Sequence, residues 1–400
     1  MVYPRDGLTT HSNTTGKRAS FINVQTSHVL PTKKSNVSRV RSGYEKVIAH
    51  RTRMPFAYSA EQDGRIEEID EAIGMVKIRY KDGSIHCINY GVEYDKNGGG
   101  GFYTTQKITI NNFKVGDKFN RGDIIVYNPD FFTKDPYSKQ VDMNIGVLAD
   151  IAFMESDGTI EDGSTISKSL SDDLEINPCH VRTLTLTRDT TVHKFANIGT
   201  KVLSTDPIII FDESVIPETM GNMDDEMISI LGKLNRATPK AKFTGTIVQI
   251  DAYYKCKLEE MSPSIQKIVK LAGSLKNARY KFAKGTDSTN NYLPSTKVVG
   301  TDRLGTDVLD DEHVIFKFYI KQDMGMNAGD KIVFDSSLKS VCGGVVDHDI
   351  QVEDGSVQVK GLMSYRSINA RIIMSPLLVG CATKVLERTE EQILDMYFGK

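Results

Sequence analysis

The sequence lacks the features by which membrane and secreted proteins are recognised. No run approaches the roughly 18–20 apolar residues that cross a bilayer. Residues Met1 to Asp6 lack the charged-then-apolar pattern of a signal peptide. We therefore predict a cytoplasmic protein with no membrane partner.

Cysteine is scarce, and its spacing excludes the usual frameworks. The five cysteines are Cys87, Cys179, Cys256, Cys342 and Cys381, and no two form a Cys-x-x-Cys pair. An odd, scattered set is typical of reduced thiols rather than of disulfides. Cys179 and His180 are the only adjacent pair with ligand chemistry, and one pair does not make a zinc site. We predict no metal bound directly by this chain.

A strong overall charge is also absent. The 50 Lys and Arg against 52 Asp and Glu leave a net charge of −2, so the whole chain is not a nucleic-acid-binding polycation. Residues 1–60 differ, because ten basic residues there face only Asp6 and Glu45. The ten are Arg5, Lys17, Arg18, Lys33, Lys34, Arg39, Arg41, Lys46, Arg51 and Arg53. We expect a solvated leader over 1–18. Over 19–55, where apolar residues are interleaved, we expect a folded basic surface for a nucleic-acid backbone.

Short β patterns dominate the rest of the chain. Strand-like segments occur at 64–69, 75–80, 181–186, 245–250 and 313–320, and Lys81-Asp82-Gly83 predicts a hairpin turn after 75–80. Residues 262–272 have helical spacing, with Pro263 near the start and Gly273 after the end, which predicts a helix covering a β core. A short acidic helix is predicted over 389–397. The fold class is therefore mainly β with some α.

Charged residues in the C-terminal half form the candidate site. Lys331 and Lys339 flank a segment joining two apolar strands, and Arg366 precedes another apolar run. Two ammonium groups and a guanidinium suit a phosphate chain. Taken alone, such residues are more often solvated surface charges. The adjacent carboxylates Glu161 and Asp162 would point to opposite faces of a strand, so at most one would reach a shared site, and a surface turn is the alternative.

Three separated motifs resemble, in the same order, the β subunit of multisubunit DNA-dependent RNA polymerases. Ala152-Phe153-Met154 and the segment 159–167 resemble the family's Ala-Phe-Met and Phe-Glu-Asp-Ser-Ile-Leu-Ile-Ser segments. Gly329-Asp330-Lys331, with Lys339 at the family's interval, resembles its Gly-Asp-Lys motif, and Arg366 with Ile368-Asn369 resembles its Ser-Arg-Met-Asn segment. The family has a glycine-rich basic loop between the two lysines, whereas this chain has residues 332–338, so Lys339 is matched less closely than Lys331.

The resemblance implies a double-psi β-barrel with an inserted flap domain and an N-terminal hybrid-binding β region. The implied parts are a basic fork-like arm (1–60), the hybrid-binding β region (61–144), the first barrel part (145–185), the flap (186–311), the second barrel part (312–385) and a C-terminal helix (386–400). The chain would be the C-terminal half of a β subunit. It would be split and divergent, as in the RNA polymerases of giant bacteriophages.

The resemblance also implies a role in nucleotidyl transfer as one subunit of a complex, inactive alone. Lys331 and Lys339 would approach the RNA 3′ end and the nucleotide phosphates, and Arg366 the triphosphate. Asp162, in preference to Glu161, would act through water on the second Mg²⁺. The family binds its catalytic Mg²⁺ with an Asp-rich loop of the β′ subunit, and this sequence has no such loop. The Mg²⁺ would therefore be held mainly by a partner.

The implied partners are β′-like subunits, an N-terminal β-like subunit, template DNA, the RNA transcript and NTPs. A promoter-specificity factor would bind at the flap. A phage-encoded chain would act in the cytoplasm of the infected host cell or be packaged in the virion. Two other classes stay open. A single-chain polymerase would need its own metal-binding aspartate loop. A β-rich nucleic-acid-binding structural protein without catalytic activity would not explain three ordered motifs.

Overall fold

The computed structural model describes most of the chain, and the fold below refers to that part. The described residues are 29–36, 39–52, 54, 56–96, 103–144, 146–212, 236–292, 303–304, 307–335, 338–353, 355, 357–371 and 375–399. The leader expected over 1–18 lies outside them. Strands account for 37% and helices for 22%, so the prediction of a mainly β fold with some α is confirmed.

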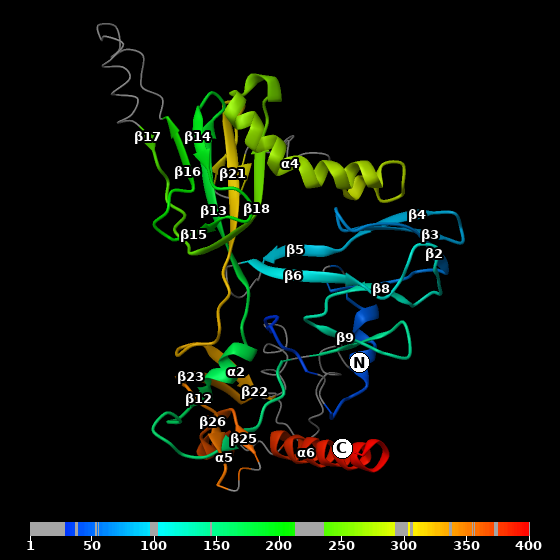
Figure 1. Cartoon of the computed structure of the whole chain (residues 1–400), viewed down its shortest axis with the longest axis vertical. Coiled ribbons are helices and arrows are strands. Elements are labelled where there is room, and N and C mark those ends of the chain that lie inside the picture. The colour runs from blue at the N-terminus through cyan, green and yellow to red at the C-terminus, as the bar shows by residue number, and fades with distance from the viewer. Residues whose placement is uncertain are drawn as a thin grey trace.

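The largest sheet runs through the upper and middle parts of the molecule (Figure 1). Its strands, in order, are β1 (Ala57–Ser59), β8 (Ile124–Tyr127), β6 (Tyr103–Ile110), β13 (Pro178–Thr187), β21 (His313–Lys321), β18 (Gly245–Tyr254) and β15 (Lys201–Val202), and β5 (Gly91–Lys96) pairs with β6. The central strand β21 buries Phe316, Phe318 and Ile320 completely. A strand with neighbours on both sides and cover on its faces reads as a nearly continuous apolar run, as 313–320 does.

The upper part is completed by a small sheet and a long helix. The sheet consists of β14 (Val192–Phe195), β16 (Ile209–Asp212) and β17 (Arg236–Ala237). The helix α4 (Pro263–Ala283) begins at Ser262, whose side chain accepts a hydrogen bond from Ile265 N. Ile265, Ile268 and Val269 pack into the same core as Phe316 and Phe318. The predicted helix over 262–272 is confirmed as a cover of a β core.

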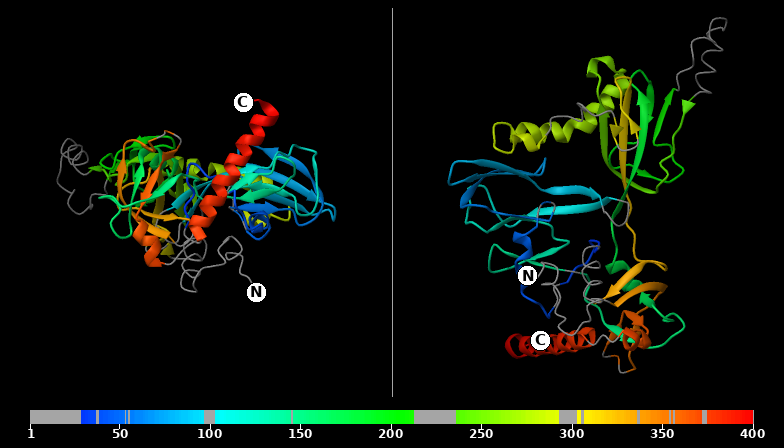
Figure 2. Two further views of the ribbon diagram at one scale, coloured as in Figure 1. Left: turned by 90° about the horizontal axis from the view of Figure 1, so that it is seen from below. Right: turned by 180° about the vertical axis from the view of Figure 1, so that it is seen from behind.

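The helix does not end at Gly273 as the sequence suggested. It continues for ten further residues to Ala283, so that its second half lies over the middle part (Figures 1 and 2). Its last turn packs with Met75 and Cys87, and Arg279 Nε donates to Ile73 O at 2.9 Å. Gly273 is buried inside the helix, and these tertiary contacts override its weak intrinsic helix preference.

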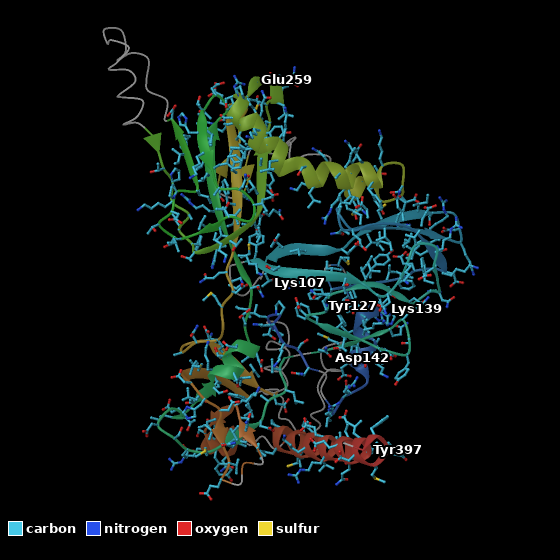
Figure 3. The ribbon with its side chains drawn as sticks, in the orientation of Figure 1. Lys107, Tyr127, Lys139, Asp142, Glu259 and Tyr397 are labelled. Atoms are coloured by element: carbon cyan, nitrogen blue, oxygen red, sulfur yellow. The ribbon has the colours of Figure 1, made fainter. Side chains whose placement is uncertain are left out.

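The middle part is built from hairpins. One sheet has the order β4 (Ile85–Asn89), β3 (Met75–Tyr80), β2 (Gly64–Asp70) and β7 (Lys118–Phe119), and β9 (Phe132–Lys134) pairs with β10 (Val141–Met143). The predicted hairpin is confirmed, with Arg79 opposite Ile85 across the turn. The core of the middle part includes Phe113. Lys139 lies against it, with its Nζ 4.5 Å from the centroid of the Phe113 ring (Figure 3).

The lower part contains a mixed five-stranded sheet. Its order is β11 (Ile151–Phe153), β26 (Gly361–Met363), β12 (Gly163–Ser167), β23 (Leu338–Val346) and β22 (Lys331–Phe334). The pairs β11–β26 and β12–β23 are parallel, whereas β12–β26 and β22–β23 are antiparallel. Strands from 151–167 thus alternate with strands from 331–363, around a core that contains Ile166, Phe334 and Met363.

The remaining helices and short elements lie in different parts of the molecule. The helices are α2 (Lys168–Asp173), α5 (Tyr365–Arg371) and α6 (Ser375–Phe398). Two-stranded pairs are formed by β19 (Arg303–Leu304) with β20 (Asp307–Val308) and by β24 (Ile350–Gln351) with β25 (Gln358–Val359). Short 3-10 helices span Tyr44–Lys46, Ile48–His50, Leu258–Glu260 and Thr289–Asn291. The helix predicted over 389–397 is part of α6, which is longer than expected because it begins at Ser375, next to a proline that favours a helix start.

Candidate functional site

The two candidate lysines lie on neighbouring strands of one hairpin. Lys331 begins β22 and pairs with Val341, and Lys339 lies on β23 and pairs with Val333. Side chains directly opposite each other in a sheet share a face, and residues two apart on a strand share it too. Both lysines therefore lie on the same face as diagonal neighbours, roughly 7–8 Å apart at the backbone. On that face Lys331, Val333, Lys339 and Val341 are all exposed.

The hairpin corrects the sequence interpretation of this segment. A loop was expected between the lysines, but β22 extends to Phe334 and β23 starts at Leu338. Ile332, Phe334 and Leu338 point to the opposite face and join the lower core. Alternation of apolar and exposed residues over 331–334 fixes this register, because a shift of β22 by one residue would turn Lys331 toward the core and Ile332 and Phe334 toward solvent. The turn begins at Asp335, which has a φ of 51°.

The carboxylates lie directly beside this hairpin. The carbonyl oxygen of Asp162 accepts hydrogen bonds from Ser340 Oγ at 2.6 Å and from Val341 N at 3.1 Å. The next residue, Gly163, starts β12 and pairs with Val341, which pairs with Lys331 on its other side. Glu161 and Asp162 form a turn ahead of the strand and are both exposed, so the expected placement within a strand was wrong. Glu161 has a φ of 53°, in the left-handed region.

Helix α5 joins the same group of segments. Ser367 Oγ donates to Glu161 O at 2.5 Å, one residue after Arg366. Glu155 fixes the start of α5, because its Oε1 accepts from Ser364 Oγ at 2.9 Å and from Arg366 N at 3.2 Å. The Arg366 side chain is 87% exposed, and its Nε lies 4.0 Å from Glu155. The guanidinium is thus available to an anion.

All five predicted residues are thereby connected through the turn at 161–162. The turn is bonded to β23 next to Lys339 on one side and to α5 next to Arg366 on the other. Within the described residues Lys331 has no ion-pair partner, whereas Lys339 and Asp162 do make further contacts. Exposed cations in this arrangement can bind phosphate oxygens. No group of three or more His, Cys, Asp or Glu side chains in the described chain could hold a metal ion.

Sequence reasoning missed the residues that hold the site together. Ser340 and Ser367 bind the turn through their hydroxyls, and Glu155 orders α5. Their positions next to the motifs could have identified them. Ser364 and Ser367 belong to the segment with Arg366, and Glu155 directly follows the Ala152-Phe153-Met154 motif. The exposed valines Val333 and Val341 were also missed, because apolar residues in a strand pattern are usually assigned to a core.

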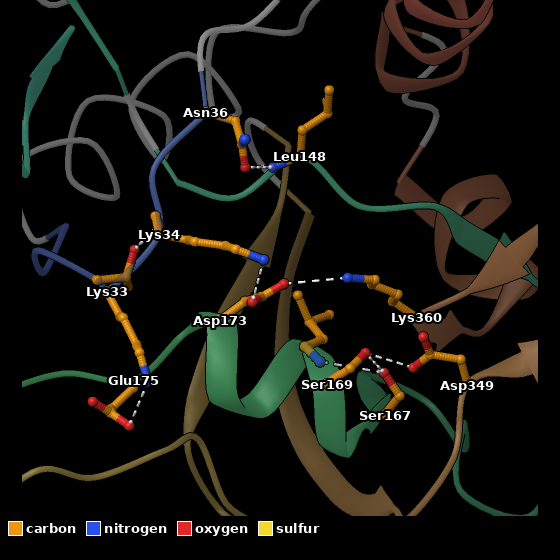
Figure 4. A network of polar contacts seen from close by, with 12 residues as sticks. Lys33, Lys34, Asn36, Leu148, Ser167, Ser169, Asp173, Glu175, Asp349 and Lys360 are labelled. Atoms are coloured by element: carbon orange, nitrogen blue, oxygen red, sulfur yellow. Dashed lines mark hydrogen bonds and ion pairs between the residues drawn. The ribbon is translucent and has the colours of Figure 1, made fainter.

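Four basic residues in the described part of the N-terminal segment form internal ion pairs. Lys33 Nζ lies 3.4 Å from Glu175, and Lys34 Nζ lies 2.8 Å from Asp173, at the end of α2 (Figure 4). Arg39 pairs with Glu390 at 2.7 Å, and Arg41 pairs with Asp142 at 2.5 Å. These four cations therefore attach the described residues on either side of position 37 to the rest of the chain. The nucleic-acid surface expected over 19–55 stays a prediction.

Asp173 is the centre of the contacts in Figure 4. It accepts from Lys34 and also from Lys360, whose Nζ lies 3.2 Å from Oδ2. Partial burial raises the pKa of Asp173, but the hydrogen bonds from Lys34 and Lys360 outweigh it and hold that pKa below its usual range. At the other end of α2, Ser169 Oγ donates to Asp349 Oδ1 at 2.6 Å, and Ser167 and Ser169 together lower the pKa of Asp349.

Comparison with known proteins adds no further identification. No model of a known protein family matches the chain, and no curated protein matches it either. The likeness to RNA polymerase β subunits therefore rests on the motifs quoted above. In the described part of the chain, no helix is both long and apolar enough to cross a membrane.

Proposed function

We propose that this chain is a phosphate-binding subunit of a nucleotidyl transferase whose active site is completed by another polypeptide. More specifically, it would be the β-like C-terminal half of a multisubunit DNA-directed RNA polymerase. The observation that carries the proposal is the convergence of three sequence motifs. The segments with Lys331 and Lys339, with Glu161-Asp162 and with Arg366 lie up to 206 residues apart, yet hydrogen bonds join them around one turn.

The chemistry of the site suits this reaction. Nucleotidyl transfer asks the protein mainly to position reactants and to neutralise charge on the transferred phosphoryl group. Lys331 and Lys339 would bind the RNA 3′ end and the nucleotide phosphates, and Arg366 would bind the triphosphate. Glu161 and Asp162 are exposed beside the lysines, and either could accept a hydrogen bond from a water bound to Mg²⁺. The ion itself would be held mainly by a β′-like subunit and would supply the Lewis acid.

The exposed valines favour an active site that is shared between chains. Val333 and Val341 are 41% and 43% exposed, between the two lysines on the same face. A face that mixes cations with exposed β-branched side chains is suited to cover by another protein surface. In the proposed assembly, 145–185 and 312–385 form a double-psi β-barrel, and 186–311 is its inserted flap.

The test is isolation of the native complex through a tag on this chain, followed by nucleotide-addition assays. We expect β′-like partners in the complex and no activity from this chain alone. Lys331→Ala should assemble normally but add nucleotides about 10- to 100-fold more slowly, because one charge-assisted contact contributes roughly 1.5–3 kcal/mol. Lys267→Ala, an exposed lysine on α4, is the matched control and should leave the rate unchanged.

Two results would contradict the proposal. A wild-type addition rate for Lys331→Ala would remove Lys331 from the site. A chain that binds nucleic acid but purifies without any β′-like polypeptide would instead favour a structural nucleic-acid-binding protein.

A further inference from the structure

The long helix α4 and the residue after it carry positive charge only. Residues 263–284 contain six basic residues and no aspartate or glutamate, whereas the whole chain has a net charge of −2. The six are Lys267, Lys270, Lys276, Arg279, Lys281 and Lys284. Acids are missing even from the first turn, where the helix dipole would favour them. The stability of the helix therefore does not explain this bias in charge.

Two of the six basic residues bind the body of the protein. Lys276 Nζ lies 3.3 Å from Asp251 Oδ1, and Arg279 Nε donates to Ile73 O. The other four are exposed, and none of them has an ion-pair partner among the described residues. Their charge is therefore available to another molecule.

Three of these exposed lysines lie in a line on the outer side of α4. With about 100° of rotation per residue, five polar residues fall within an arc of about 80°. We call this set the α4 stripe: Lys270, Ser274, Asn277, Lys281 and Lys284. All five are exposed, and they lie opposite Ile265, Ile268 and Val269, which pack in the core. Lys267 falls just outside the arc.

The stripe is long and has no cover. At about 1.5 Å per residue, it extends over about 21 Å from Lys270 to Lys284. The second half of α4 reaches beyond the upper part, and Figure 1 shows no described segment over the side that faces away from the middle part. A straight row of cations of this length is suited to an extended anion.

We propose that the α4 stripe binds the phosphodiester backbone of a nucleic acid, independently of base sequence. Lysine ammonium groups neutralise phosphates, and an asparagine amide such as that of Asn277 donates to phosphate oxygens. The hydroxyl of Ser274 already donates to Leu271 O at 2.8 Å, so this residue contributes its small size, which lets a backbone lie close to the helix. The stripe has no aromatic side chain on which a base could stack.

Two other occupants fit the stripe less well. The centres of protein interfaces are rich in aromatic residues and poor in lysine, which is the reverse of this composition. A membrane-surface helix inserts its apolar side into the bilayer. In α4 that side is buried in the core, and Leu271 and Leu275, beside the stripe, are only 37% and 45% exposed. A nucleic acid is therefore the polyanion that the stripe favours.

The proposal does not rest on the proposed polymerase function, and its test needs no nucleotide addition. The full-length chain is titrated, at several salt concentrations, with a DNA duplex of about 20 base pairs and separately with a single strand of similar length. Lys270→Gln with Lys281→Gln and Lys284→Gln should weaken duplex binding at least about 10-fold. It should also reduce the slope of log K against log salt by about 2.7, because each phosphate contact contributes about 0.9. A loss in either arm supports the proposal, and the arm with the larger loss identifies the form of nucleic acid.

The matched control is Lys201→Gln with Lys240→Gln and Lys242→Gln. It removes the same charge from exposed lysines of the upper part that lie outside α4, and it should keep the wild-type slope. Circular dichroism should show both triple variants folded, since every altered side chain is exposed. In the wild-type chain, bound nucleic acid should protect the three stripe lysines from acetylation and leave the three control lysines reactive.

Four results would overturn the proposal. The first is an equal loss of affinity and slope in the two triple variants, which would show an effect of net charge alone. The second is unchanged acetylation of the stripe lysines in the bound chain. The third is competition by polyglutamate as strong as by DNA of the same total charge, which would point to an acidic protein. The fourth is stripe-dependent binding to vesicles of phosphatidylcholine and phosphatidylserine. A complex that binds nucleic acid through α4 but adds no nucleotides would contradict only the proposed function.

Discussion

Asp173 holds distant segments of the chain together through ion pairs that cannot be recognised from the sequence around it. In the sequence it is one acid in a Ser/Lys-rich segment, remote from both lysines that bind it. In the structure its carboxylate lies between Lys34 and Lys360 and joins the N-terminal segment to α2 and to the residue before β26. Only the fold brings these three residues together, so no local pattern could have identified the contact.

We expect Asp173→Asn to destabilise the chain by about 1–2 kcal/mol at neutral pH, since it removes two charge-assisted hydrogen bonds that involve half-exposed lysines. The folded-state pKa of Asp173 is lowered. Its contribution is therefore complete above the unfolded pKa of about 4 and is lost as the pH falls through the lower folded value. Urea unfolding measured between pH 7 and pH 3 should show the two proteins converging at the acid end.

The control for this experiment is Asp172→Asn, one residue earlier. Asp172 pairs with Lys168 within the same helix, and both side chains are more than half exposed. Such a surface pair contributes less than about 0.5 kcal/mol. Equal loss of stability in the two variants would show that Asp173 has no special role.

At the scale of elements, the sequence predicted which helices and hairpins form better than it predicted where they begin and end. The hairpin over 75–89 was predictable because Asp82-Gly83 is a strong local turn signal. The length of α4 was not, because Gly273 suggested an end, and only the packing of its last turn on Met75 and Cys87 extends the helix. The segment between Lys331 and Lys339 was interpreted as a loop, whereas β22 and β23 pair across it. The pairing that brings Asp162 beside Ser340 is non-local and has no sequence signal of its own.

The first half of α4 should contribute strongly to stability through its buried side. Ile268 is 1% exposed and packs in the core of the upper part, so Ile268→Ala should leave a cavity and lower the free energy of unfolding by about 2–5 kcal/mol. The neighbouring Lys267 is exposed, and Lys267→Ala should change stability by less than about 0.5 kcal/mol. Thermal denaturation followed by circular dichroism measures both. Similar melting temperatures for all three proteins would mean that α4 does not pack on the sheet in solution.

For the whole molecule, the main feature is that α4 and the largest sheet connect the upper and middle parts twice. The sheet passes between them where β6 pairs with β13, and α4 reaches the turn between β2 and β3, where Arg279 donates to Ile73 O. Tyr319 on β21 adds a third contact, with ring centroids 5.7 Å from Tyr94 and 5.4 Å from Tyr103. None of these connections was predicted, since each joins segments that are distant in the chain.

Removing the Arg279 contact should loosen the middle part selectively. In Arg279→Ala the carbonyl of Ile73 loses a charge-assisted hydrogen bond that contributes about 1.5–3 kcal/mol. Hydrogen exchange should therefore accelerate in β3 and β4 more than in β18 and β21. Lys281→Ala changes an exposed lysine two residues away and should leave the exchange pattern unaltered. Uniform acceleration over all four strands would contradict the assignment of α4 as a local support.

The lower part, with its lysines and Arg366, is joined to this frame differently. The segments before β13 and after β21 run alongside each other, and there Ile176 and Met324 exchange both backbone hydrogen bonds at 2.8 and 3.0 Å. The N-terminal segment adds a second tie, because Lys34 pairs with Asp173 of the lower part and Arg41 pairs with Asp142 of the middle part. The surface that carries the cations is therefore anchored to the frame at two separate places.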